Sequence, residues 1–183
     1  DDITQSVVAA IEPEMLLTEG RRALRKNPAN LDAFDRCMRG IWHFQQFQRD
    51  ENREAEMWLR GAIERDPSLA IAHMCLARAL NTRIWWGWSD DIDSDLEQAA
   101  AFAHQAMVLD KTDPQALALA GSALFLTRPY EAAAILDRAI ALDPNHFSAW
   151  NWRGWNALVL GEKDAALYFE SALRLSPNFP GRY

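Results

Sequence analysis

The stretch that decides the fold is EAAAILDRAIALDP, residues 131–144, because its pattern returns as DAALYFESALRLSP at residues 164–177. The offset of 33 residues, from 131 to 164, extends upstream, where Gly121 falls on Gly154. Whole units therefore correspond, rather than one short tract. Self-similarity at a period of this length is typical of a protein built from stacked repeats.

Earlier copies are marked by an alanine five residues before a proline, as Ala139 precedes Pro144. The same spacing occurs in RALRKNP and GAIERDP, which end at Pro28 and Pro67. In the copy that follows, Lys111 takes the place of the proline. The markers are separated by 33 to 44 residues, so we expect the additional residues of the longer copies to lie in loops.

Within each unit, apolar residues recur at intervals of three and four, as in Leu117, Ala120 and Leu124. This spacing indicates an amphipathic helix. Turn signals interrupt each unit in the middle. Where the proline is present, an Asp-Pro or Ser-Pro step ends the unit, because proline disfavours a helical conformation for the preceding residue. The sequence therefore predicts two antiparallel helices in each unit and an all-α chain.

The segment AWNWRGWNALVLGEKDAALYFESALRLSP, residues 149–177, resembles the tetratricopeptide repeat (TPR). The residues that match this family's pattern are Trp150, Gly154, Gly161, Ala165, Phe169, Ala172 and Pro177. The resemblance implies a right-handed α-α superhelix of helical hairpins. The expected parts are an N-terminal capping helix at 1–28, repeats at 29–67, 68–111 (with a Trp- and Asp-rich insertion), 112–144 and 145–177, and the start of a truncated continuation at 178–183.

A stripe of alanines in the repeats is assigned to helix packing, because small residues let two helices approach closely. It comprises Ala55, Ala62, Ala99, Ala106, Ala132, Ala139, Ala165 and Ala172. We expect no chemistry from these residues.

In TPR proteins the first helices of the hairpins line a concave face, so the resemblance implies a set of partner-binding side chains. We take Met38, Ala77, Gly121 and Gly154 as equivalent positions, and we select the residues three before, one after and four after each of them. The resulting set is Asp35, Arg39, Trp42, Met74, Arg78, Asn81, Ala118, Ser122, Phe125, Asn151, Trp155 and Leu158. The expected partner is a protein or peptide segment.

Arg39 and Arg78 would then occupy the same place in adjacent repeats, where two guanidinium groups suit a carboxylate or an extended peptide backbone. The alternative is an ordinary surface pair, since Asp35 lies four residues before Arg39. The aromatic members of the set are either interface anchors or core residues. Nothing in the set reproduces the Lys and Asn arrangement with which chaperone-binding members of the family hold a C-terminal carboxylate.

The largest insertion, RIWWGWSDDIDSDLEQ at residues 83–98, is expected to form an irregular loop. Its indoles Trp85, Trp86 and Trp88 form either an exposed contact site or a plug between long helices. We favour the plug, because indoles gain most from burial and monomers rarely expose large apolar patches.

Three aspartates in this insertion, Asp91, Asp93 and Asp95, have the alternate spacing of calcium-loop ligands. However, Leu96 and Phe102 stand where such a loop requires glycine and glutamate. We therefore interpret the aspartates as an N-terminal helix cap.

Composition excludes several classes of function. A formal net charge of -7 over 183 residues disfavours nucleic acid and anionic membranes as partners. No apolar run approaches the roughly 18 residues of a membrane-spanning helix. Cys37 and Cys75 are expected to be reduced thiols, and the 4 histidines belong to no recognisable metal or catalytic motif. We predict no catalytic, cofactor or metal site, and a cytoplasmic location.

The opening residues 1–35 and the stretch at 87–121 resemble proteobacterial signalling proteins in which an output domain precedes a TPR region. That domain is a class III adenylate or guanylate cyclase, or a winged-helix DNA-binding domain. The resemblance implies that this chain is a piece of a longer protein and has a regulatory function. The favoured output domain is a cyclase, and the protein's own output domain is one candidate partner of the repeats. The alternatives are an oligomerisation scaffold of a winged-helix regulator, which would form a homo-oligomer, and an enzyme fragment with a cryptic site.

Overall fold

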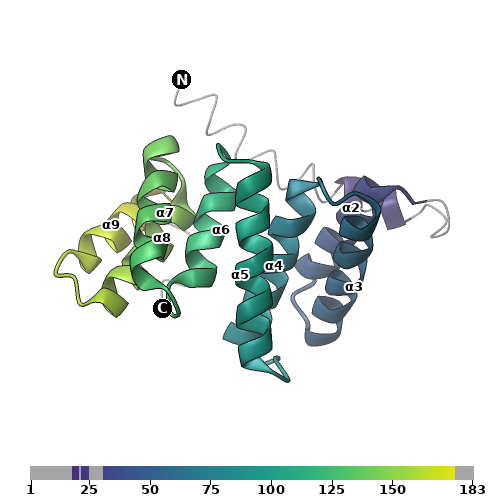
Figure 1. Cartoon of the computed structure of the whole chain (residues 1–183), viewed down its shortest axis with the longest axis horizontal. Helices are drawn as coiled ribbons and strands as arrows, with labels where there is room; N and C mark the ends of the chain where they lie inside the picture. The colour runs from purple at the N-terminus through teal and green to yellow at the C-terminus, as the bar shows by residue number, and fades with distance from the viewer. Residues whose placement is uncertain (1–17, 21, 25–30, 176–183) are drawn as a thin grey trace. The chain divides into compact units, whose positions relative to one another are not determined.

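The computed structural model describes residues 18–20, 22–24 and 31–175 (Figure 1). Every regular element within these ranges is helical, which confirms the predicted all-α fold class. The helices are α2 Ala33–Gln45, α3 Arg49–Arg65, α4 Ala70–Trp85, α5 Ile92–Leu109, α6 Pro114–Leu124, α7 Pro129–Leu142, α8 Phe147–Leu160 and α9 Ala165–Leu175. Most of the predicted capping helix at 1–28, and all of the predicted continuation at 178–183, lie outside the described residues.

The chain divides into two compact units, residues 1–95 and 96–183, and the division falls within α5. In the first unit α3 packs against α2 and α4, and in the second α7 packs against α6 and α8, while α8 also contacts α9. Fully buried side chains fill each unit, including Cys37, Leu59, Leu76 and Leu80 in the first and Leu117, Leu136, Ala139 and Ala149 in the second. The predicted ranges 29–67, 68–111, 112–144 and 145–177 each contain two consecutive helices.

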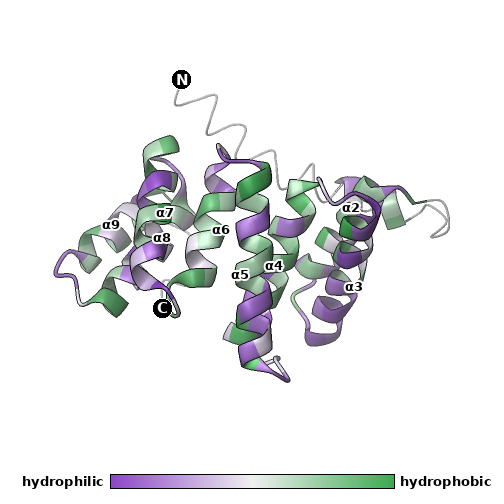
Figure 2. Ribbon diagram, in the orientation of Figure 1, coloured by the Kyte–Doolittle hydropathy of each residue, from purple (hydrophilic) through white to green (hydrophobic). Residues whose placement is uncertain are grey.

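Only a narrow side of helix α3 is buried. Figure 2 shows this helix as mostly hydrophilic, and its buried side consists of Asn52, Ala55, Leu59 and Ala62. The alanines belong to the stripe that we assigned to packing. All members of that stripe are buried, which confirms the assignment.

Side-chain caps fix where three of the first helices begin. Asp32, Asp113 and His146 accept backbone N–H groups from the first turns of α2, α6 and α8, at 2.7, 2.8 and 3.2 Å. At the other end of α8, Gly161 adopts a left-handed conformation with φ 70°, which glycine tolerates without strain. Gly161 therefore ends α8.

A glycine in three first helices touches the second helix of the same hairpin. A Cβ added at Gly40 would lie 2.6 Å from Leu59 Cγ, and a Cβ added at Gly154 would lie 2.7 Å from Phe169 Cε1. Gly121 is packed against the next helix in the same manner. A larger side chain at these points would force the helices apart.

These glycines also correct the predicted alignment of the first repeat. Gly40, Gly121 and Gly154 follow their N-cap residues by equal intervals and make the same kind of contact. Gly40 rather than Met38 is therefore the equivalent of the later glycines. The choice of Met38 shifted the expected surface positions of that repeat by two residues.

The extra length of the second repeat lies mainly in its helices. Helix α4 has 16 residues and α5 has 18, whereas α6 and α7 have 11 and 14. The connection between α4 and α5 comprises only residues 86–91. The expectation of an irregular loop over 83–98 was wrong, because both ends of that stretch continue the flanking helices.

Candidate interaction surfaces

Arg39 lies in the interior of the first unit rather than on its surface. Only 5% of the residue is exposed. Its Nη2 donates to the backbone oxygen of Ala23 at 2.8 Å, and its guanidinium lies 4.5 Å from the ring centroid of Trp58. Arg39 therefore attaches the segment around Ala23 to the first hairpin, and in this structure it does not face an external partner.

Arg153 occupies the equivalent place in the second unit, because each of these arginines directly precedes the helix-contact glycine. It is 6% exposed and lies 4.6 Å from the ring centroid of Tyr168. Its Nε donates to Asp137 at 2.8 Å, and its Nη1 lies 2.9 Å from Glu162. We did not single out Arg153 from the sequence. The shared Arg-Gly step would have revealed that Arg39 corresponds to Arg153 and not to Arg78.

Several other members of the predicted set are also buried. Asp35, Asn81, Ser122 and Phe125 are 9%, 6%, 3% and 3% exposed. Phe125 packs against Trp152 with a ring-centroid distance of 5.6 Å. Ala118 is part of the core as well. In the structure these side chains stabilise their own units.

The exposed part of the predicted set in the first unit centres on Arg78. Its guanidinium lies 5.0 Å from the ring centroid of Phe44. Phe44 is the equivalent of Asn81, because each lies the same number of residues after its helix-contact position, Gly40 or Ala77. Met74, on the same helix, is half-buried. Arg78 thus presents a cation that is already held on an aromatic ring. Phe44 was absent from the predicted set because the first repeat was aligned on Met38 instead of Gly40.

Trp42 of the same helix as Phe44 is half-buried. Its ring packs edge-on against His43, with centroids 5.0 Å apart, and His43 Nδ1 lies 2.6 Å from Glu51 Oε2. The predicted role of Trp42 as an anchor stays a prediction.

In the second unit, the exposed members of the set lie on α8. Trp155 is 42% exposed and Leu158 is 54% exposed, while Asn151 is half-buried. The Trp155 ring packs edge-on against Phe169, with centroids 5.5 Å apart. This face therefore offers apolar area and one amide, which suit a polypeptide segment.

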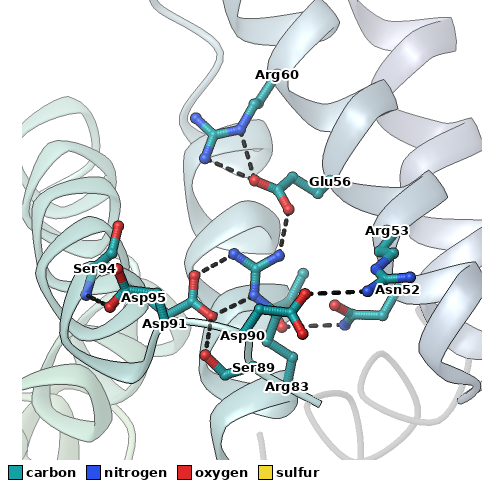
Figure 3. Close-up of polar contacts among 11 residues, drawn as sticks. Asn52, Arg53, Glu56, Arg60, Arg83, Ser89, Asp90, Asp91, Ser94 and Asp95 are labelled. Carbon is teal, nitrogen blue, oxygen red and sulfur yellow. Dashed lines mark hydrogen bonds and ion pairs between the residues drawn. The ribbon is translucent and has the colours of Figure 1, made fainter.

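A charged network fixes the connection between α4 and α5 (Figure 3). Arg83 donates two hydrogen bonds to Asp95 and one to Glu56, the latter at 2.5 Å. Ser89 Oγ donates to Asp95 at 2.7 Å. Burial alone would raise the pKa of Asp95, but the hydrogen bonds from Arg83 and Ser89 and the charge of Arg83 outweigh it and lower that pKa. The network joins α3, α4 and the start of α5.

The predicted cap is confirmed for Asp91, whose Oδ1 accepts from Ser94 N at 3.0 Å. Asp93 lies in the first turn of α5, where a negative charge is favourable. Asp95 has a further role that the sequence did not reveal, because its partner Arg83 lies on the preceding helix.

The predicted plug is wrong. Trp85 and Trp86 are 49% and 59% exposed, and Trp88 is half-buried. Phe47, from the connection between α2 and α3, packs edge-on against Trp86 with centroids 4.9 Å apart and lies 5.6 Å from Trp88. The rings of Trp85 and Trp86 therefore lie at the surface, and Trp88 is only partly covered. We call Phe47, Trp86 and Trp88 the aromatic patch.

The cysteines are free thiols, as expected. Burial raises the pKa of both thiols, and the pKa of Cys75 reaches about 11 although the charge of Arg78 acts in the opposite direction.

Within the described ranges, no three side chains of His, Cys, Asp or Glu gather closely enough to hold a metal ion. None of the helices that the structure describes has the length and apolarity needed to cross a bilayer.

Helical hairpins in which a small residue of the first helix packs against the second, as in α2–α3, α6–α7 and α8–α9, are typical of the TPR fold. The TPR protein TTC0263 of Thermus thermophilus superposes with a TM-score of 0.71, 20% sequence identity, and coverage of 97% of this chain and 90% of that chain. The first TPR domain of Spaghetti (RPAP3), bound to the HSP90 peptide SRMEEVD, gives a TM-score of 0.59 and 21% identity over 72% of this chain and 94% of that one.

Sequence comparison adds one curated relative, the putative adenylate cyclase 3 of Rhizobium meliloti (strain 1021). It is 31% identical over 115 residues, which are 63% of this chain and 20% of that protein. The chain thus spans about a fifth of the length of the curated relative that it matches. No family model matches the chain.

Proposed function

We propose that this chain is the protein-interaction region through which a larger bacterial signalling protein, a nucleotide cyclase, is regulated. The observation that carries the proposal is the 31% identity to a putative adenylate cyclase over 115 residues. Because the described residues form helical hairpins, the likeness lies in a repeat region, and its role is to control an output domain that precedes it.

The exposed side chains of the first helices support a protein or peptide partner. Arg78 is held on Phe44 in the first unit, and Trp155 and Leu158 are exposed in the second. A guanidinium can bind a carboxylate or a backbone carbonyl, and partly exposed tryptophans are typical interface anchors. The TPR domain of RPAP3 binds a peptide, which agrees with a partner of this kind.

The test requires the full-length protein and a version that lacks residues 18–175. Conversion of ATP and GTP to their cyclic monophosphates is measured for both by chromatography. We expect the full-length protein to form a cyclic nucleotide and the deletion to change its rate. If neither nucleotide is converted, the parent is not a cyclase, and equal rates with and without the repeats would refute the regulatory role.

Partner capture tests the surfaces themselves. The full-length protein is cross-linked in cells, and partners recovered with wild type are compared with those recovered with Arg78→Ala. Arg65→Ala is a matched control, because Arg65 is an exposed arginine at the end of a second helix. We expect Arg78→Ala alone to reduce recovery, and equal losses in both variants would contradict the assignment.

A further inference from the structure

The aromatic patch of the first unit is an exposed apolar surface. Phe47 and Trp86 are 49% and 59% exposed, and their rings are in edge-to-face contact. Trp88 completes the cluster, with its ring centroid 6.3 Å from that of Trp86. Clustered exposed aromatic rings are uncommon on monomers and mark interaction sites.

The backbone under the patch is held in place on both sides. Arg49 Nη2 donates to Asp90 Oδ1 at 2.8 Å, and Arg53 Nη2 donates to Asp90 Oδ2 at 3.1 Å, which ties the start of α3 to the connection after α4. Ser89 is fixed by Asp95, as Figure 3 shows. A surface that is ordered before binding loses less conformational entropy when a partner docks.

Phe47 adds a further sign of function. Its φ is 53°, in the left-handed region that bulky residues rarely occupy. A glycine would adopt this conformation without steric cost. The chain instead places an exposed aromatic ring there, and strained residues of this kind concentrate at functional positions.

The charges around the patch decide which partner it suits. Asp50 in the first turn of α3, Asp91, and Asp93 in the first turn of α5 are exposed acids. Asp90 is exposed although it is bonded to Arg49 and Arg53, and Arg53 also lies 3.6 Å from Asp50. The acids outnumber the two arginines, so the surroundings of the rings are negative. Tryptophan faces also attract lysine and arginine through cation–π contacts. Anionic lipid and nucleic acid would be repelled.

We propose that the aromatic patch is a docking site for a polypeptide segment that carries lysine or arginine next to apolar side chains. The apolar residues pack on Phe47, Trp86 and Trp88, and the cations contact the indole faces and the neighbouring carboxylates. This site shares no residue with the surface of Arg78 and Phe44, and the proposal does not depend on the cyclase assignment.

The test uses a fluorescein-labelled peptide of repeated Lys-Leu-Ser, measured by fluorescence anisotropy against the full chain. We expect binding that weakens about tenfold or more in Trp86→Ala, and similarly when every lysine of the peptide is replaced by glutamate. Phe34→Ala is the matched control for Phe47→Ala, since Phe34 is 48% exposed in the same unit. Phe34→Ala should bind as wild type does, and Phe47→Ala should not.

Three results would overturn the proposal. They are no binding of the lysine peptide up to roughly millimolar concentration, equal binding of the glutamate peptide, and equal binding by wild type and Trp86→Ala. Vesicles of phosphatidylserine and phosphatidylcholine form a further arm, and vesicle binding that depends on Trp86 would assign the patch to a membrane instead. Circular dichroism melts of each variant test whether the fold is retained, and we expect retention because the replaced side chains are exposed.

Discussion

Replacement of Arg83 by methionine should strongly destabilise the first unit. The Arg83 side chain is 17% exposed, and the carboxylate partners Glu56 and Asp95 are 20% and 5% exposed. Methionine keeps much of the side-chain volume but leaves both carboxylates without this cation. Removal of one member of a buried ion pair costs about 3–5 kcal/mol. We expect about 3 kcal/mol, because Glu56 retains Arg60 at 2.7 Å and water reaches part of the network.

The assay is urea denaturation followed by circular dichroism, with Arg53→Met as the matched control. Arg53 also bonds a carboxylate, that of Asp90, but the two side chains are 52% and 75% exposed, and exposed pairs contribute about 1 kcal/mol or less. A loss below about 1 kcal/mol for Arg83→Met, or a loss equal to that of Arg53→Met, would refute the reasoning that burial makes this network stabilising.

Three further predictions concern pH and backbone geometry. The pKa of Asp95 is lowered in the folded chain, so its ionised carboxylate stabilises the fold above the unfolded pKa of about 3.9, and this stabilisation is lost as the pH falls through the folded pKa. Asp95→Asn should therefore reduce the fall in melting temperature that accompanies acidification. An unchanged dependence of melting temperature on pH would exclude this carboxylate as a cause. Gly121→Ala should cost about 1–3 kcal/mol in urea denaturation because the new Cβ would meet Leu136. Gly61→Ala is the control, because its added Cβ would meet only the flexible end of an arginine side chain. It should be neutral or stabilise by up to about 1 kcal/mol. Equal changes in stability for Gly121→Ala and Gly61→Ala would contradict the close contact between Gly121 and the next helix. Phe47→Gly should be about 1 kcal/mol more stable than Phe47→Ala in the same assay, since only alanine is strained at φ 53°, and no difference would mean that the turn relaxes.

The hairpins could be predicted from the sequence because their determinants are local. The alanine spacing recurs in each copy, and a proline step recurs in all copies except the one with Lys111. Both signals report the contact between two helices that are adjacent in the chain. The start of α2 was harder to locate. The proline markers lie at the ends of second helices, whereas the register of a first helix is set by its N-cap and by Gly40 against Leu59.

The candidate surface was predicted less well, because exposure depends on residues distant in the sequence. Arg39 was expected to face a partner, but Ala23 and Trp58 enclose it. The indoles near Gly87 were expected to be buried, but Trp85 and Trp86 are exposed. Periodicity places a residue on a face of its helix and does not show what covers that face.

The paired positions of Arg153 and Tyr168 restrict how such repeats can be exchanged in protein engineering. The first repeat has the same combination of arginine and aromatic ring, whereas the third has Ala120 and Ile135 at the equivalent positions. Transfer of the arginine alone into the third repeat would place a guanidinium against an aliphatic side chain. The transferable module is therefore the two-residue combination, and a chimaera that keeps each combination intact should fold where a single-residue graft fails.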